Sequence, residues 1–173
     1  MISAARSELS GLIIRAAVGR GLPIGVADEL SAAAIALCAA GQDGAKLALQ
    51  ALETDPKPAK FSDGVLVGES LPILAPSAFD LAETGSVKLR TSADVALLDG
   101  YAMARGGGWT VSGTGPNYVL EKSTSSAMPG NTPPPYAVAR EVWDGLVELG
   151  VGALVPATPE TSAGAGAGQI DND

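Results

Sequence analysis

The N-terminal part of the chain has the apolar periodicity of two consecutive helices. Between residues 22 and 41, apolar side chains recur with a helical period, and alanine occupies most of the other positions. A helix with so little charge is expected to be buried on most of its circumference. Another apolar stripe runs through residues 4–18, for which Ser3 is a suitable N-cap. Because Gly21 and Pro23 interrupt the pattern between them, these segments predict an antiparallel helix hairpin.

The hairpin is followed by a third predicted helix and then by a break in the pattern. Asp43 is a good N-cap for a short helix over residues 45–52. Two prolines within residues 54–60 end the helical pattern. We therefore divide the chain into a helical subregion, residues 1–53, and a mixed subregion, residues 61–156.

Strands and helices alternate in the mixed subregion. Ser77, followed three positions later by Asp80, predicts a short capped helix that ends at Gly85. A longer apolar stripe predicts a final helix over residues 136–149. Short apolar or alternating runs predict strands at 64–67, 71–74, 87–91, 109–112, 118–122 and 151–156, with 109–112 and 118–122 forming an antiparallel pair.

Residues 93–105 allow two interpretations. Alanine is common there and β-branched residues are few, which favours a helix with Arg105 in its last turn, at the negative end of the helix dipole. The alternative is a hairpin whose tight turn is the Asp99-Gly100 pair.

Composition supports a folded domain with an aliphatic core. The chain has 173 residues, of which 46% are hydrophobic and only 4% are aromatic. Together with the element pattern, this predicts one α+β domain over residues 1–160. In it the N-terminal helix hairpin packs on a small mixed or antiparallel sheet with additional helices.

Charge and residue usage exclude several chemistries. The net charge is −8 and the eleven basic residues are scattered, so we expect no nucleic-acid partner and no binding to a membrane surface. The chain has no histidine, which excludes Ser-His-Asp relays and His-ligated zinc, and no nucleotide-binding loop occurs. We therefore expect no metal and no cofactor.

Two further observations bear on the cellular compartment. The single cysteine, Cys38, lies in the alanine-rich helix and is interpreted as a small buried hydrophobe. Near the start, the apolar run is short and is interrupted by Arg15, so we expect neither a signal peptide nor a membrane span. A cytoplasmic location is the resulting prediction.

Residues 161–173 form a compositionally distinct, Gly/Ala-rich acidic tail. Gly164, Gly166 and Gly168 alternate with alanine, and Asp171 and Asp173 follow. One interpretation is a strap whose backbone N–H groups and carboxylates contact a ligand or a neighbouring subunit. The other is a solvated terminus, which the conformational entropy of glycine favours.

Both ends of the chain resemble a bacterial family, a domain of unknown function. The resemblance joins GLPIGVADELSAAAIALCAAGQDG near the start to VPATPETSAGAGAGQIDND at the end. It implies that the glycine-rich ending is a family feature. It implies no activity.

The N-terminal segment RAAVGRGLPIGVADELSAAAIALCAAGQDGAKL is also similar to the malate/L-lactate dehydrogenase family that is unrelated to the Rossmann dehydrogenases. In that family a helix pair leads into a Gly-x-Asp-Ser-His-Gly motif with a catalytic histidine. This chain has Gly41, Gln42, Asp43 and Gly44 there and lacks the Ser-His pair. The resemblance therefore implies the helix hairpin without the enzyme.

These observations predict a non-catalytic module that binds an unknown small molecule or assembles into a homo-oligomer. Arg90, on a predicted strand, is a candidate for binding an anionic ligand, although an outward-facing charge explains it equally. Carboxylates such as Glu29 and Asp80 are interpreted as helix-terminal charges or caps. The alternatives are a hydrolase-like enzyme that uses carboxylates alone, or a degenerate relative of the dehydrogenase family.

We predict that the chain associates with itself through its apolar helices or its tail. Size-exclusion chromatography with light scattering should give a mass above that of one chain. A variant that lacks residues 162–173 tests the contribution of the tail. A full-length monomer that stays monomeric after this deletion would contradict the prediction.

Overall fold

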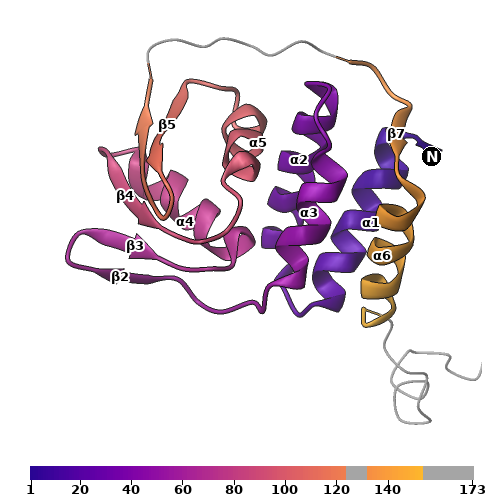
Figure 1. Cartoon of the computed structure of the whole chain (residues 1–173), viewed down its shortest axis with the longest axis horizontal. Coiled ribbons are helices and arrows are strands. Elements are labelled where there is room, and N and C mark those ends of the chain that lie inside the picture. Colours follow the sequence, from indigo (N-terminus) through magenta and orange to yellow (C-terminus); the bar gives the residue numbers. More distant parts are fainter. Residues whose placement is uncertain (124–131, 154–173) are drawn as a thin grey trace, which may run out of the picture.

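The computed structural model describes residues 1–123 and 132–153. Within these residues the fold is α+β, with the predicted helices at the N-terminus (Figure 1). The helices are α1 (Arg6–Gly19), α2 (Ile24–Ala39), α3 (Gly44–Glu53), α4 (Leu71–Ala82), α5 (Ala96–Ala104) and α6 (Arg140–Val151). The strands are β1 (Ile2–Ala4), β2 (Lys60–Ser62), β3 (Val65–Val67), β4 (Val87–Arg90), β5 (Trp109–Thr114), β6 (Asn117–Lys122) and β7 (Tyr136–Val138).

Helix α2 is the centre of the helical part. It packs against α1, as the sequence predicts, and also against α3, α4 and α5. Its buried side chains are mostly small, and the one buried hydroxyl group among them, that of Ser31, pairs with the hydroxyl of Ser10 on α1 at 2.8 Å. The prediction that this helix is buried on most of its circumference is confirmed.

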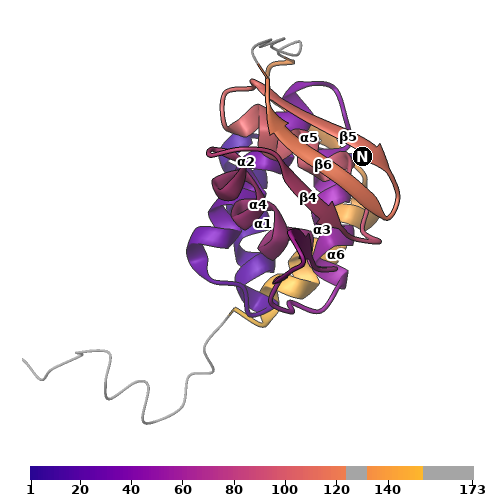
Figure 2. The same ribbon diagram turned by 90° about the vertical axis from the view of Figure 1, so that its left-hand side faces the viewer.

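A mixed five-stranded sheet lies at one side of the molecule, and Figure 2 shows its strands in front of the helices. The strand order is β2-β3-β4-β6-β5, and only β3 and β4 are parallel within it. Helix α4 packs on β3, β4 and β6, and α5 packs on β5. Helices α4 and α5 therefore connect the sheet to α2.

The last described helix returns to the helical half. Helix α6 packs on α1 and α3, and β7 pairs with β1 in the register Ile2 with Val138 and Ala4 with Tyr136. Buried residues of both halves form one continuous hydrophobic core.

The short β1–β7 sheet corrects two predicted boundaries. Ser3 lies in β1, so it does not cap a helix, and α1 begins after Ala5, whose N–H donates to the Glu8 carboxylate at 2.8 Å. Tyr136 lies in β7, so the final helix begins at Arg140. A strand of three residues is stabilised by pairing with a distant strand. The local pattern of apolar residues carries no information about that partner. The predicted strand 151–156 is wrong at Val151, which ends α6, and residues 154–156 lie outside the described residues.

The predicted strand 71–74 is wrong, because these residues form the first turn of α4. Pro72 suits this turn, where a missing N–H leaves no intrahelical bond unmade. The predicted helix from Ser77 is the second half of the same helix. A short run that is apolar on every side has no period to distinguish a buried helix from a buried strand.

Residues 96–104 are helical, as the favoured interpretation predicts, and Gly100 serves close packing rather than a turn. A Cβ atom at Gly100 would lie 2.6 Å from the carbonyl oxygen of Ala33 and 2.8 Å from Cδ1 of Leu37, both on α2. Helix α5 therefore approaches the backbone of α2 more closely than any larger residue at this position allows.

Other sequence predictions are confirmed by the described residues. The strands at 87–91, 109–112 and 118–122 and the helix at 45–52 are present within about a turn of their predicted bounds. Cys38 is buried, and burial raises the pKa of its thiol. None of the helices in residues 1–123 and 132–153 has both the length and the apolar character needed to cross a membrane.

We predict that Gly100→Ala lowers the free energy of unfolding by about 1–3 kcal/mol, because the added methyl group meets the backbone of α2. Gly11→Ala, within α1, is the matched control, since no atom outside the backbone of its own helix and its two chain neighbours lies within 4 Å of its Cβ position. It should raise the free energy of unfolding by about 0.5–1 kcal/mol through helix propensity. Urea denaturation of both variants measures this, and equal effects would contradict the packing role of Gly100.

Candidate functional site

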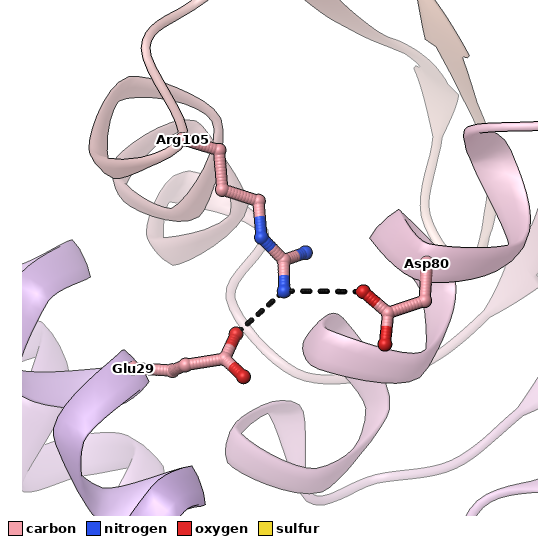
Figure 3. Close-up of polar contacts among 3 residues, drawn as sticks. All are labelled: Glu29, Asp80 and Arg105. Atoms are coloured by element: carbon pink, nitrogen blue, oxygen red, sulfur yellow. Dashed lines mark hydrogen bonds and ion pairs between the residues drawn. The ribbon is translucent and has the colours of Figure 1, made fainter.

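Arg105 extends from the end of α5 into the space between α2 and α4. The helix ends here because Gly106, Gly107 and Gly108 follow with positive φ angles. Figure 3 shows the carboxylates of Glu29, from α2, and Asp80, from α4, converging on the guanidinium group. Nη2 of Arg105 lies 2.6 Å from Oε2 of Glu29 and 3.4 Å from Oδ1 of Asp80.

The two ion pairs are unequal. The side chain of Arg105 is 26% exposed, and Glu29, its closer partner, is half-buried. Asp80 is 78% exposed, so water screens its attraction for the guanidinium and the pair contributes little to stability. Glu29 is therefore the main electrostatic partner of Arg105.

The aromatic ring of Phe79 also contacts the guanidinium. Its central carbon lies 5.0 Å from the centre of the Phe79 ring, a cation–π distance. Phe79 also contacts Trp109 edge-on, with ring centres 5.1 Å apart, and stacks beside Tyr101 at 6.3 Å. A planar guanidinium suits this position between a ring and two carboxylates, whereas a lysine ammonium would lose the stacking.

Two buried polar atoms of the cluster have no hydrogen-bond partner. They are the hydroxyl oxygen of Tyr101 and Nη1 of Arg105, and they are the only such side-chain atoms among the described residues. The Tyr101 side chain is nearly inaccessible, with the residue 1% exposed. Buried polar groups in folded proteins are nearly always bonded, and each one that is not destabilises the fold by about 1–3 kcal/mol.

A pocket of about 160 Å³ is lined in part by the two residues that carry these atoms. Its lining consists of Glu29, Ala32, Tyr101, Ala104 and Arg105. The residues around the pocket are thus two alanines, a tyrosine, an arginine and one acidic residue.

Burial is the main cause of an upward shift in the pKa of the Tyr101 hydroxyl, well above its ordinary value. The negative charge of Glu29 raises this pKa further, and the positive charge of Arg105 partly opposes the shift. The hydroxyl therefore keeps its proton throughout the physiological pH range and always has a hydrogen to donate.

The residues predicted as a site from the sequence do not join this cluster within the described structure. Arg90 is exposed at the carboxyl end of β4, and its Nε donates to Oδ1 of Asn117 on β6 at 3.3 Å. The other predicted site residues lie outside the described residues: Gly164, Gly166, Gly168, Asp171 and Asp173.

Sequence reasoning assigned local roles to three residues of the cluster. The sequence alone accounts for Glu29 and Asp80 as helix-terminal groups and for Arg105 as a cation at a helix end. Each of these local roles explains its residue without any contact to the other two. One signal was available in the sequence. Tyr101 and Arg105 are four positions apart, which places both on one face of a helix.

Other pockets carry less evidence of a ligand. One of about 410 Å³ shares Ala32 and Ala104 with the Arg105 pocket and continues along α2 to Tyr136. Another, of about 380 Å³, is lined by Cys38, Asp43, Thr132 and other residues, and no unpaired buried polar side chain of the described residues faces it. Residues 1–123 and 132–153 also hold no group of three His, Cys, Asp or Glu side chains placed to bind a metal.

Comparisons with known proteins return no match for this chain, whether to protein-family models, to curated proteins or to solved structures. The resemblances to a bacterial family and to the dehydrogenase family therefore stay predictions. The functional interpretation depends on the geometry of the Arg105 cluster.

We predict that Tyr101→Phe raises the free energy of unfolding by about 1 kcal/mol, because it removes a buried hydroxyl that has no partner. The ring keeps its packing against Phe79. Tyr118→Phe, at a half-buried position on β6, is the control and should change stability by less than about 0.5 kcal/mol. Thermal or urea denaturation measures both, and a clear loss of stability in Tyr101→Phe would show that the hydroxyl is bonded in the folded protein.

Proposed function

We propose that this chain is a small-molecule-binding protein and that the pocket beside Arg105 is its binding site. The observation that carries this proposal is the pair of buried, unbonded donors, Tyr101 and Arg105, in the lining of one pocket. A ligand that accepts hydrogen bonds from both relieves the cost of burying them.

The surroundings of Arg105 resemble those of a preorganised binding residue. Glu29 and Asp80 hold the guanidinium from two helices, and Phe79 supports its flat face. A binding group whose rotamer is fixed in advance loses little conformational entropy when the ligand arrives.

The same contacts favour binding over carboxylate-based catalysis. The bonded oxygens of Glu29 and Asp80 share one guanidinium nitrogen, so they lie within about 6 Å of each other, a separation seen in glycoside hydrolases. However, each of these oxygens accepts a hydrogen bond from Arg105, which has no acceptor atom to offer in return. Both carboxylates thus share the task of holding one guanidinium group, so a non-catalytic role is proposed.

The cellular setting is part of the proposal. A single buried cysteine suits a reducing compartment, which supports the cytoplasm. A homo-oligomer remains a prediction. Since the apolar faces of α1 and α2 are covered within the chain, other exposed apolar side chains, such as Val147 and Val151 on α6, would have to form its interface. No nucleic-acid partner is proposed.

A screen of small compounds by ligand-observed NMR tests the proposal, with one variant at a position shared by the two neighbouring pockets and one at a position that lines the larger pocket alone. Ala32→Phe places a ring in the Arg105 pocket, whereas Ala36→Phe, one turn further along α2, reaches only the larger neighbouring pocket. We expect hits that bind the native chain and Ala36→Phe but not Ala32→Phe. Arg105→Met should also abolish binding, while Arg140→Met, at an exposed position on α6, should not.

The outcome that contradicts the proposal is equally specific. If every hit binds Ala32→Phe and Arg105→Met as well as it binds the native chain, the Arg105 pocket is not the binding site. Both variants are first checked for an unchanged circular-dichroism spectrum, so that lost binding is not confused with lost folding.

A further inference from the structure

Building on the proposed function, we propose that the Arg105 pocket recognises a neutral carbonyl compound whose carbonyl oxygen is flanked by an N–H group, as in a primary amide or a lactam. Three properties of the pocket support this ligand class: its hydrogen-bonding groups, its charge and its size.

Hydrogen bonding calls for an acceptor atom that can take two donors. Nη1 of Arg105 only donates, and the protonated hydroxyl of Tyr101 has a hydrogen to donate. A carbonyl oxygen has two lone pairs and can satisfy both groups at once. An alkyl or aryl group in the same place would leave both donors buried and unpaired.

Glu29 supplies the complementary acceptor. Its Oε2 is bonded to Arg105, whereas its Oε1 has no hydrogen bond within the described residues, and Glu29 lines the same pocket. An N–H group next to the ligand carbonyl can donate to Oε1. A ketone or an ester lacks this donor, so the amide arrangement matches the pocket more fully.

Charge argues against an ionised ligand. Two carboxylates, Glu29 and Asp80, surround one guanidinium, so the cluster carries a net negative charge. An anion that approaches Arg105 in the pocket meets above all the repulsion of Glu29, which lines the pocket. A cation is attracted by Glu29 but places its charge beside the guanidinium and offers no acceptor to the two donors. A neutral ligand avoids both penalties.

The pocket opens to solvent, and its volume suits a ligand group of a few heavy atoms. A volume of about 160 Å³ is close to that of a cavity known to hold benzene, which is about 150 Å³. The methyl groups of Ala32 and Ala104 provide apolar contact for a ring or a short chain. A six-membered ring with one amide group is therefore a suitable probe.

Three compounds with the same ring test the inference, because they differ mainly in charge: benzamide is neutral, benzoate is anionic and benzamidine is cationic near pH 7. Each is titrated into the full chain by NMR or calorimetry, up to about 10 mM, since ligands with so few atoms bind weakly. We expect benzamide to bind at least about tenfold more tightly than either of the others. This ratio corresponds to one unfavourable charge contact in a partly exposed site.

Two variants connect the result to named groups. Tyr101→Phe should weaken benzamide binding about tenfold, with Tyr118→Phe unchanged, because one of the two donors is lost. Glu29→Gln removes a negative charge, so benzoate should bind this variant severalfold more tightly than it binds the native chain.

The outcomes separate this inference from the function on which it rests. If benzoate or benzamidine binds most tightly and its binding is lost in Ala32→Phe, the pocket is a binding site but the ligand class is wrong. If benzamide binds equally well to Tyr101→Phe, the proposed carbonyl contact is wrong. If none of the three binds, the inference fails, and the compound screen alone then decides the proposed function.

Discussion

Helix α5 rests on α2 through a contact that depends on the absence of a side chain. A Cβ atom at Gly100 would lie 2.6 Å from the carbonyl oxygen of Ala33, a distance that real Cβ atoms do not reach. Helix α3 meets α2 in the same way, because a Cβ at Gly44 would lie 2.0 Å from the carbonyl oxygen of Ala34. The alanine-rich sequence of α2 and the glycines of its neighbours thus set the spacing of the helices.

That spacing also shapes the candidate site. Tyr101 and Arg105 follow Gly100 on α5, and Glu29 and Ala32 precede Ala33 on α2. When the two backbones approach at Gly100, the side chains one turn away are brought together at the rim of the contact. Helix α4 completes the arrangement with Phe79 beneath the guanidinium and Asp80 beside it. The packing of the core and the geometry of the pocket therefore have one cause, so a change in helix spacing would alter both.

The sequence predicts the parts of this molecule that have a period of their own. The stripes of α1 and α2 and the alternation in β4 are local, and the structure confirms them. The run at 71–74 has no period, and β1 and β7 exist only through their pairing across the chain, so these could not be predicted. The Arg105 cluster could not be predicted for a related reason. Glu29 and Arg105 are 76 positions apart, and each has an adequate local explanation as a helix-end charge.

Other polar groups of the core bear on the proposal of a ligand site, because they show how buried hydroxyls are paired elsewhere in the fold. Ser31 is as deeply buried as Tyr101, yet its hydroxyl is paired with Ser10, and the hydroxyl of buried Thr91 accepts from the N–H of Ala93 at 3.1 Å. The hydroxyls of Ser31 and Thr91 are thus satisfied within the fold. Among the described residues, the two exceptions belong to Tyr101 and to Arg105 at the end of α5, and both residues line one pocket. Phenylalanine would pack at position 101 without this cost. A sequence that keeps tyrosine there retains a donor that the protein itself does not use, which is the arrangement expected where the missing partner is a ligand.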